Sequence, residues 1–175
     1  KKTQEGNKPK FSTLALVGDH NGHIGIGYGK SKETVPAREK AVRQAKLNLI
    51  KIRRGCGSWQ GNCGTPHSIP FAVEGKCGSV RLTLKPAPKG KGLCVEKECA
   101  KVLSLVGIAD VWAKSRGQTR NKINMIAALE DALRKLCTTK LHAKDFASLS
   151  ILEGGASTPA TPAPVSAASA GRYRL

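Results

Sequence analysis

The chain has 175 residues and a mass of 18.5 kDa, a length that suits one domain or two small ones. Hydrophobic residues make up 39% of it and 19 more residues are glycine, so a packed core is possible and a fully disordered chain is excluded. Thirty Lys and Arg oppose 12 Asp and Glu, and because a net charge of +18 destabilises an isolated compact chain, we expect a polyanionic partner to compensate it. Aromatic residues are only 4%, which disfavours a single-strand reader based on base stacking.

The termini and the cysteines indicate the compartment. No apolar stretch approaches the roughly 18 residues of a membrane helix. The start, KKTQEGNKPK, has no apolar core and is not a secretory signal, and because it lacks an initiator Met we expect residues upstream of it. A chain of this length with an ordinary core does not need a disulfide scaffold. We therefore expect a reduced, cytoplasmic setting for the six cysteines, Cys56, Cys63, Cys77, Cys94, Cys99 and Cys137.

The positive charge is spread along the chain. Residues 1–55 carry a net charge of +9, residues 56–145 carry +8, and residues 146–175 carry +1. A basic tail would indicate loose tethering, whereas a basic body indicates several faces packed against phosphates. This distribution favours burial inside a nucleoprotein particle.

Two strands and a hairpin are predicted near the start. Residues 11–17 form an apolar run of strand length, and Asn21-Gly22 is a strong hairpin signal. Residues 23–30 then alternate, with Ile24, Ile26 and Tyr28 on one face and glycines on the other. The glycine face would let another backbone approach closely, either protein or RNA. A thin edge strand explains the same pattern equally well.

A helix is predicted over residues 34–50, with Pro36 in its first turn, where the missing N–H costs little. Its apolar stripe consists of Ala41, Val42, Ala45 and Leu49. A basic stripe at helical spacing is usually only a solvated face, but here basic residues continue past the helix end and favour phosphate contact. The basic residues are Lys40, Arg43, Lys46, Lys51, Arg53 and Arg54. Strand–strand–helix with a basic helix resembles the later part of a double-stranded-RNA-binding fold.

The second half reads as a separate small domain, so we predict an α+β protein of two small domains without internal repeats. Strands are expected at 69–73 and 80–84, joined around 74–78, and a short strand is expected at 111–113. Residues 86–92 read as a loop, and helices are expected at 96–106, ended by Gly107, and at 122–136. The predicted divisions are domain 1–54, glycine- and cysteine-rich linker 55–66, domain 67–145 and tail 146–175.

The tail is rich in Ala, Ser, Thr and Pro, a composition that buries too little surface to order itself. We therefore expect a partner surface to hold it. Arg172 and Arg174, with Tyr173 between them, suit an anchor on RNA phosphates and bases.

Catalytic chemistry finds little support. The four histidines form no Ser/His/Asp or Cys/His arrangement, and the few carboxylates mostly neighbour lysines, so no enzyme is expected. Residues 88–93 (PKGKGL) are superficially similar to the phosphate loop of small-molecule kinases, but Gly-Ser-Ser does not follow. No cofactor is required. Zinc is a weak possibility without a C-x-x-C pair, and isolated reduced thiols explain the same residues, Cys56, Cys63, His67 and Cys77.

Three long stretches resemble a known family, that of small ribosomal subunit protein five (universal S-five). They are FSTLALVGDHNGHIGIGYGKSKETVPAREKAVRQAKLNLI, GTPHSIPFAVEGKCGSVRLTLKPAPKGKGL and KVLSLVGIADVWAKSRGQT. The resemblance spans residues 1–137, and the linker RRGCGSW…PHSIP is closer to the archaeal form.

This resemblance implies a double-stranded-RNA-binding-like first domain, a three-stranded sheet with one helix and without its leading helix. It implies a second domain of the left-handed βαβ type, shared with translocases and small-molecule kinases, which accounts for the kinase-like loop. The implied role is structural, near the messenger entry channel and the decoding site, with an influence on decoding accuracy. The implied partners are small-subunit ribosomal RNA and the S-four and S-eight proteins, with no membrane.

The resemblance also implies contact residues. Residues 5–10 correspond to the family's basic loop. The residues expected at ribosomal RNA are Lys2, Lys8, Lys10, Lys30, Lys32, Arg43, Lys46, Arg53, Arg54, Lys114, Arg116, Arg120, Asn121, Arg172 and Arg174. Those expected to face the S-four partner are Gly78, Ser79, Arg81, Lys89 and Lys91. Two alternatives stay open: a free duplex-RNA-binding module and a kinase-like protein.

Overall fold

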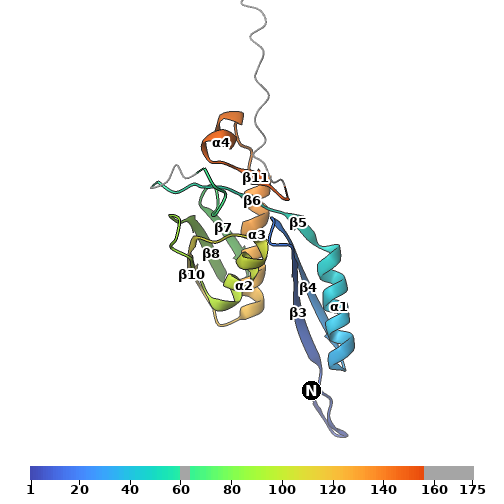
Figure 1. The fold of residues 1–175 in the computed structure, drawn as a ribbon. Coiled ribbons are helices and arrows are strands. Elements are labelled where there is room, and N and C mark those ends of the chain that lie inside the picture. The colour runs from blue at the N-terminus through green and yellow to red at the C-terminus, as the bar shows by residue number, and fades with distance from the viewer. Residues whose placement is uncertain (60–63, 156–175) are drawn as a thin grey trace, which may run out of the picture.

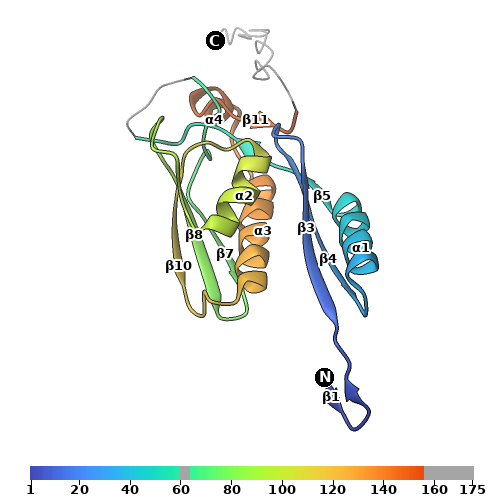
Figure 2. The same cartoon turned by 60° about the horizontal axis from the view of Figure 1, so that its bottom comes forward.

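The computed structural model describes residues 1–59 and 64–155. Its first lobe begins with a small hairpin, β1 (Lys2–Thr3) and β2 (Gly6–Asn7), which extends away from the body (Figure 2). Strands β3 (Phe11–Gly18), β4 (His23–Ser31) and β5 (Leu49–Lys51) form an antiparallel sheet in the order β3-β4-β5. Helix α1 (Thr34–Leu47) covers one face of this sheet. The predicted helix is thus three residues shorter at its end, because residues 49–51 form the third strand.

The glycine face of β4 packs on α1. A Cβ on Gly25, Gly27 or Gly29 would lie 2.0–2.1 Å from a carbonyl oxygen of the helix. The three residues that supply these oxygens, Ala45, Ala41 and Ala37, are completely buried. The predicted close approach of a backbone to the glycines is therefore confirmed, and that backbone belongs to the same chain.

The second lobe holds a four-stranded sheet in the order β7-β8-β10-β9. Its strands are β7 (Val73–Cys77), β8 (Val80–Pro86), β9 (Leu93–Cys94) and β10 (Val111–Arg116). Strand β9 runs parallel to β10 and is joined to it through α2 (Lys97–Val106), while the other pairs are antiparallel. Helix α2 ends at Gly107 in the left-handed conformation, as predicted. Helix α3 (Lys122–Thr138) packs on β7 and β8.

The predicted strand over residues 69–73 is wrong by about four residues. The observed strand β7 begins at Val73 and its turn lies at Gly78, which has a φ of +58°. Pro70 has no N–H for a sheet ladder, and the peptide groups of Ser68 and Ile69 instead bond to Gly55 and Gly57. The apolar run before β7 therefore packs against the linker.

The two lobes share one hydrophobic core. Helices α2 and α3 lie between the second sheet and strands β3 and β4, and α1 lies beyond the first sheet (Figures 1 and 2). Ile24, Ile26 and Ile52 of the first lobe belong to the same buried cluster as the second-lobe residues. Backbone hydrogen bonds also cross the junction, from Gly22 N–H to the Val106 carbonyl, for example. None of the helices in the described ranges combines the length and the apolar character that crossing a bilayer requires.

The chain after α3 closes over this junction. Helix α4 (Ala143–Ser148) is followed by β11 (Leu152–Glu153), which pairs with β6 (Arg53–Arg54). Ile151 and Leu152 are buried. The prediction of an unstructured tail from residue 146 is therefore wrong as far as residue 155. The rest of the predicted tail, with Arg172 and Arg174, lies outside the described residues.

Candidate nucleic-acid interface

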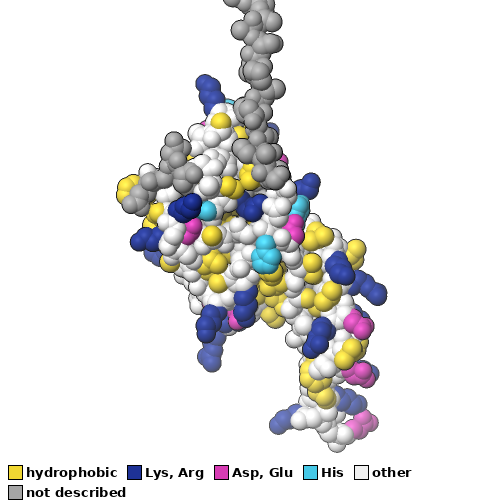
Figure 3. Space-filling model, in the orientation of Figure 1, with side chains coloured by type: hydrophobic (Ala, Val, Ile, Leu, Met, Phe, Trp, Pro, Cys, Tyr) yellow, Lys and Arg dark blue, Asp and Glu magenta, His cyan; other side chains and the backbone are white. Residues whose placement is uncertain are grey.

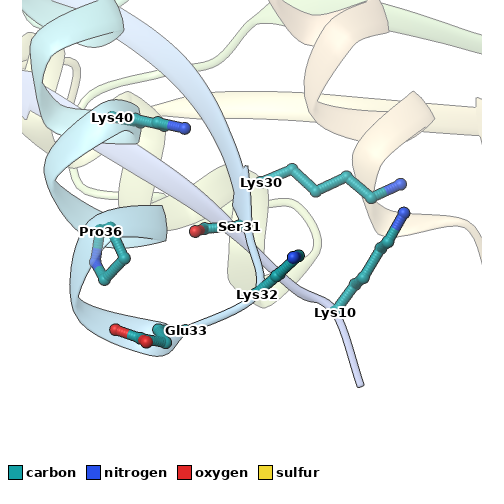
Figure 4. Close-up of a pocket in the computed structure, with 7 residues that line it drawn as sticks. All are labelled: Lys10, Lys30, Ser31, Lys32, Glu33, Pro36 and Lys40. Carbon is teal, nitrogen blue, oxygen red and sulfur yellow. The ribbon is translucent and has the colours of Figure 1, made fainter. Parts of the chain in front are cut away.

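A basic groove lies where β4 ends and α1 begins. It has a volume of about 610 Å³ and is lined by Lys10, Lys30, Ser31, Lys32, Glu33, Pro36 and Lys40. Lys10 and Lys30 point in the same direction, Lys40 points towards them from α1, and the Glu33 carboxylate points away (Figure 4). The four lysines are exposed, and none of them forms an ion pair with another residue of the described ranges. This end of the lobe therefore presents uncompensated positive charge in a concave surface.

The outer face of α1 extends the basic surface. Arg43 and Lys46, both expected at RNA, are exposed there and line a shallow groove of about 450 Å³ with Arg38, Glu39 and Val42. Sequence reasoning passed over Arg38 and left Lys40 out of the expected contacts. The sequence does contain a signal for both residues. Lys40 belongs to the predicted basic stripe, and Arg38 lies two helical turns before Lys46 and so on the same side of the helix.

The N-terminal hairpin carries two further expected contacts. Lys2 and Lys8 are exposed, and the Lys8 ammonium lies 2.7 Å from the Glu5 carboxylate. Such an exposed pair contributes little to stability, so Lys8 can exchange Glu5 for a phosphate at small cost.

Arg53 and Arg54, both expected at RNA, form hydrogen bonds within the fold, Arg53 half-buried and Arg54 buried. The Arg54 side chain is buried and donates to Asn21 Oδ1 at 2.7 Å and to the Gly154 carbonyl at 3.4 Å. This burial lowers the pKa of Arg54. Arg53 donates to Glu153 Oε1 at 2.5 Å and to the Thr139 carbonyl at 2.6 Å. Both guanidinium groups hold the C-terminal segment on the lobe junction.

The remaining basic candidates lie at one end of the second sheet. Lys114, Arg116 and Arg120 are exposed at the end of β10 and in the loop to α3. Asn121 caps α3, since its side-chain oxygen accepts a hydrogen bond from the Asn124 N–H at 3.4 Å. Figure 3 shows Lys and Arg projecting from several sides of both lobes.

The residues expected at a protein partner form two groups. Gly78, Ser79 and Arg81 lie at the β7–β8 turn, and Arg81 pairs in register with Arg116, so this turn adjoins the basic end of β10. Lys89 and Lys91 follow the other end of β8, which is seven residues or roughly 20 Å away. The five residues therefore do not form one continuous patch.

The weak zinc candidate is not brought together by the described residues. Cys63 lies outside them, and within them no three His, Cys, Asp or Glu side chains cluster as metal ligands would. The His67 Nδ1 lies 2.8 Å from Asp110 Oδ2, and both side chains are buried. Asp110 Oδ1 also accepts a hydrogen bond from Gly92 N–H at 2.7 Å. This N–H of the kinase-like loop is therefore bonded to the residue that directly precedes β10.

Comparison with known proteins shows that the chain is a ribosomal protein. Residues 1–53 match the model of the N-terminal domain of ribosomal protein S5, and residues 75–146 match that of its C-terminal domain. The chain is similar to small ribosomal subunit protein uS5 of Nanoarchaeum equitans, with 54% identity over 142 residues, which are 81% of this chain and 62% of that protein.

Two further archaeal relatives agree. The uS5 protein of Picrophilus torridus is 46% identical over 153 residues, which are 87% of this chain and 69% of that protein. The uS5 protein of Methanocaldococcus jannaschii is 46% identical over 151 residues, 86% of this chain and 70% of that protein. The chain belongs to the uS5 family of small-subunit ribosomal proteins, a family without enzymatic activity, and spans 62–70% of the length of these three relatives.

Proposed function

We propose that the chain is a structural constituent of the small ribosomal subunit and binds ribosomal RNA through the first lobe. The observation that carries the proposal is the groove of Lys10, Lys30, Lys32 and Lys40, whose ammonium groups have no ion-pair partner among the described residues. The outer face of α1 would extend the contact. Membership of the uS5 family supports the same role.

Phosphate binding follows from the geometry of this groove. Lys30 lies in β4, Lys10 directly before β3 and Lys40 in α1, so lysines from three segments of the chain line one concave region. A phosphate chain in the groove would neutralise charges that repel one another in the free protein and would release counterions. Binding of this kind is tight at low salt and weakens steeply as salt is added.

We also propose a protein-facing role for the β7–β8 turn, near the messenger entry region. The turn residues Gly78 and Ser79 and the neighbouring Arg81 are exposed at an edge of the second lobe. Such an edge would suit the S-four neighbour, and contact there would influence decoding accuracy. We further propose a contact with the S-eight neighbour. We also propose that the β9–α2–β10 crossover is left-handed, as the resemblance implies.

Sedimentation tests the proposed function directly. A tagged copy of the protein should co-migrate with small subunits on a sucrose gradient after a moderate salt wash. The triple variant Lys30→Glu, Lys32→Glu, Lys40→Glu should leave the subunits at lower salt than the parent. If each lysine contacts one phosphate, the slope of log affinity against log salt for isolated ribosomal RNA should become less negative by about 2–3.

A matched variant separates this site from net charge. Lys97, Lys140 and Lys144 are exposed lysines away from the groove, and reversing all three changes the net charge by the same amount. This control should keep its place on the gradient and its salt slope. Equal losses in the two variants, or a parent chain that never migrates with small subunits, would refute the proposal.

A further inference from the structure

A second concavity lies between the lobes, next to the basic groove. It has a volume of about 390 Å³ and is lined by Leu14, Ile26, Tyr28, Gln44, Asn48, Ile123, Ile126, Ala127 and Glu130. We call it the inter-lobe cleft. One wall is the face of β3 and β4 opposite α1, and the other wall is α3.

The walls of the cleft expose apolar and aromatic surface that the fold leaves uncovered. The side chains of Tyr28 and Ile123 are 46% and 48% exposed. Leu14 pairs in register with Tyr28 and therefore shares its face of the sheet. Large apolar side chains exposed together on a monomer indicate a binding surface.

An open strand edge borders the cleft. Strand β5 pairs with only His23–Gly25, so within residues 1–59 and 64–155 no strand pairs with the rest of β4 on that side. The Gly22 carbonyl accepts from Ile52 N–H and the Ile26 carbonyl from Asn48 Nδ2, which shows that peptide groups of even-numbered residues point to this edge. Because these groups alternate along an antiparallel strand, the N–H and C=O of Tyr28 point there as well. The cleft thus offers a donor and an acceptor beside an aromatic ring.

The cleft continues into the lysine groove. Pro36, Lys40, Gln44 and Asn48 follow one another at four-residue spacing, so they form a stripe along α1. The first two line the lysine groove and the last two line the cleft. Lys30 lies two residues after Tyr28 on the same face of β4, about 7 Å further along the strand. A ligand in the cleft would therefore have cations within reach of its neighbouring groups.

We propose that the inter-lobe cleft receives one unpaired base of the RNA whose phosphates occupy the lysine groove. The base stacks on the Tyr28 ring and faces the apolar surface of Ile123 and Ala127 on α3. Its polar edge meets the Gln44 amide and the peptide group of Tyr28. Splayed bases are recognised in this way, by a stacking ring together with hydrogen bonds to the base edge.

Charge favours RNA over a protein segment as the occupant. The lysines that continue the cleft would be left unpaired by an apolar peptide but neutralised by the phosphates that flank a base. The one acidic group in the lining, Glu130, is already bonded to Arg134 Nη2 at 2.8 Å. The proposal rests on the proposed RNA-binding function and assigns a specific part of that surface.

Substitution of Tyr28 tests the stacking contact in assembled small subunits. Tyr28→Leu keeps an apolar side chain and removes the ring, whereas Tyr28→Phe keeps the ring. Base-specific chemical probing should reveal an unpaired nucleotide that is protected in the parent. Its reactivity should rise at least fivefold in Tyr28→Leu and stay unchanged in Tyr28→Phe. Subunits that contain each variant and show the same reactivity at every nucleotide would overturn the proposal.

A photo-crosslinker at position 123 tests the occupant without depending on Tyr28. Benzoylphenylalanine in place of Ile123 should give an adduct at the same ribosomal RNA nucleotide, whereas the same label at the exposed Val35, beside the lysine groove, should react with other nucleotides. A protein adduct, or no adduct, would overturn the proposal for the cleft. The lysine variants separate this failure from a wider one. If the triple lysine variant still leaves the small subunits at lower salt than the parent, the proposed RNA binding by the lysine groove is supported. Only the proposal of a base in the cleft is then refuted.

Discussion

The contact between β4 and α1 determines the position of the lysine groove, and Gly27→Ala should disrupt it. A Cβ on Gly27 would lie 2.1 Å from the Ala41 carbonyl oxygen and 2.3 Å from the Ala45 nitrogen. Both atoms are helix backbone, so no side-chain rotation relieves the clash. Because ordinary contact begins near 3.4 Å, the helix would have to move away from the strand by about 1.3 Å.

The expected cost is at the upper end for overpacking, about 3 kcal/mol, because backbone is fixed on both sides. This amounts to a change of more than a hundredfold in the unfolding equilibrium. For a chain of 175 residues it corresponds to a fall in Tm of roughly 6–12 °C. The affinity of the lysine groove for RNA should also fall, because displacement of α1 moves Lys40 away from Lys30.

Thermal and urea unfolding of the purified protein, followed by circular dichroism, measure this cost. Gly155→Ala is the control, since the nearest atoms of the described residues to its Cβ would be in the Asn21 and His23 side chains, at 3.4 Å or more, and it should change stability by less than about 0.5 kcal/mol. Adding Ala41→Gly to Gly27→Ala should restore nothing, because the obstacle is a carbonyl oxygen. A Gly27→Ala variant that melts within 2 °C of the parent would refute the packing argument.

Three more substitutions test other parts of the molecule. Leu152→Ala should cost about 2–4 kcal/mol in urea unfolding, because Leu152 is 8% exposed; an unchanged midpoint would show that the C-terminal segment adds no stability. The Lys135 ammonium lowers the pKa of Asp131 below 3.8, so this carboxylate stabilises the fold above pH 4 and loses the effect as the pH falls through the lowered value. The stability advantage of the parent over Asp131→Asn should therefore shrink on acidification, and a constant difference would contradict this. Ser79→Arg should alter misreading in a reporter assay with normal subunit incorporation, without the backbone strain of a substitution at Gly78; unchanged misreading would count against the proposed protein contact at the β7–β8 turn.

The pairing of β4 with α1 shows what the sequence could predict. Alternate glycines in β4 are spaced about 7 Å apart, and every fourth residue of α1 is spaced about 6 Å along the helix axis. These two spacings nearly match, so three glycines can face three alanines in succession. The glycine face predicted a close approach, and the apolar stripe that includes Ala41 and Ala45 predicted a buried helix face. Only the tertiary fold showed that each is the partner of the other.

Arg54 shows what the sequence could not predict. It continues a basic stripe, and its neighbours give no sign of burial. The groups that accept its hydrogen bonds are on Asn21 and Gly154, which are 33 and 100 residues away. The C-terminal segment was missed for a related reason. Averaged over residues 146–175 the composition looks unstructured, and this average hides Ile151 and Leu152, which are buried beside β6.

The shared core and the C-terminal segment together explain why a strongly basic chain would keep its two lobes fixed. Strand β4 ends, and α1 begins, on the side of the molecule where β10 ends and α3 begins (Figures 1 and 2). The lysine groove and the basic loop around Arg116 therefore face the same side, where the helix N-termini add further positive potential. Repulsion between these like charges favours separation of the lobes. Arg53 and Arg54 oppose the separation by fastening residues 152–154 across the junction, so the fold holds the two basic ends at a constant spacing for a rigid polyanion.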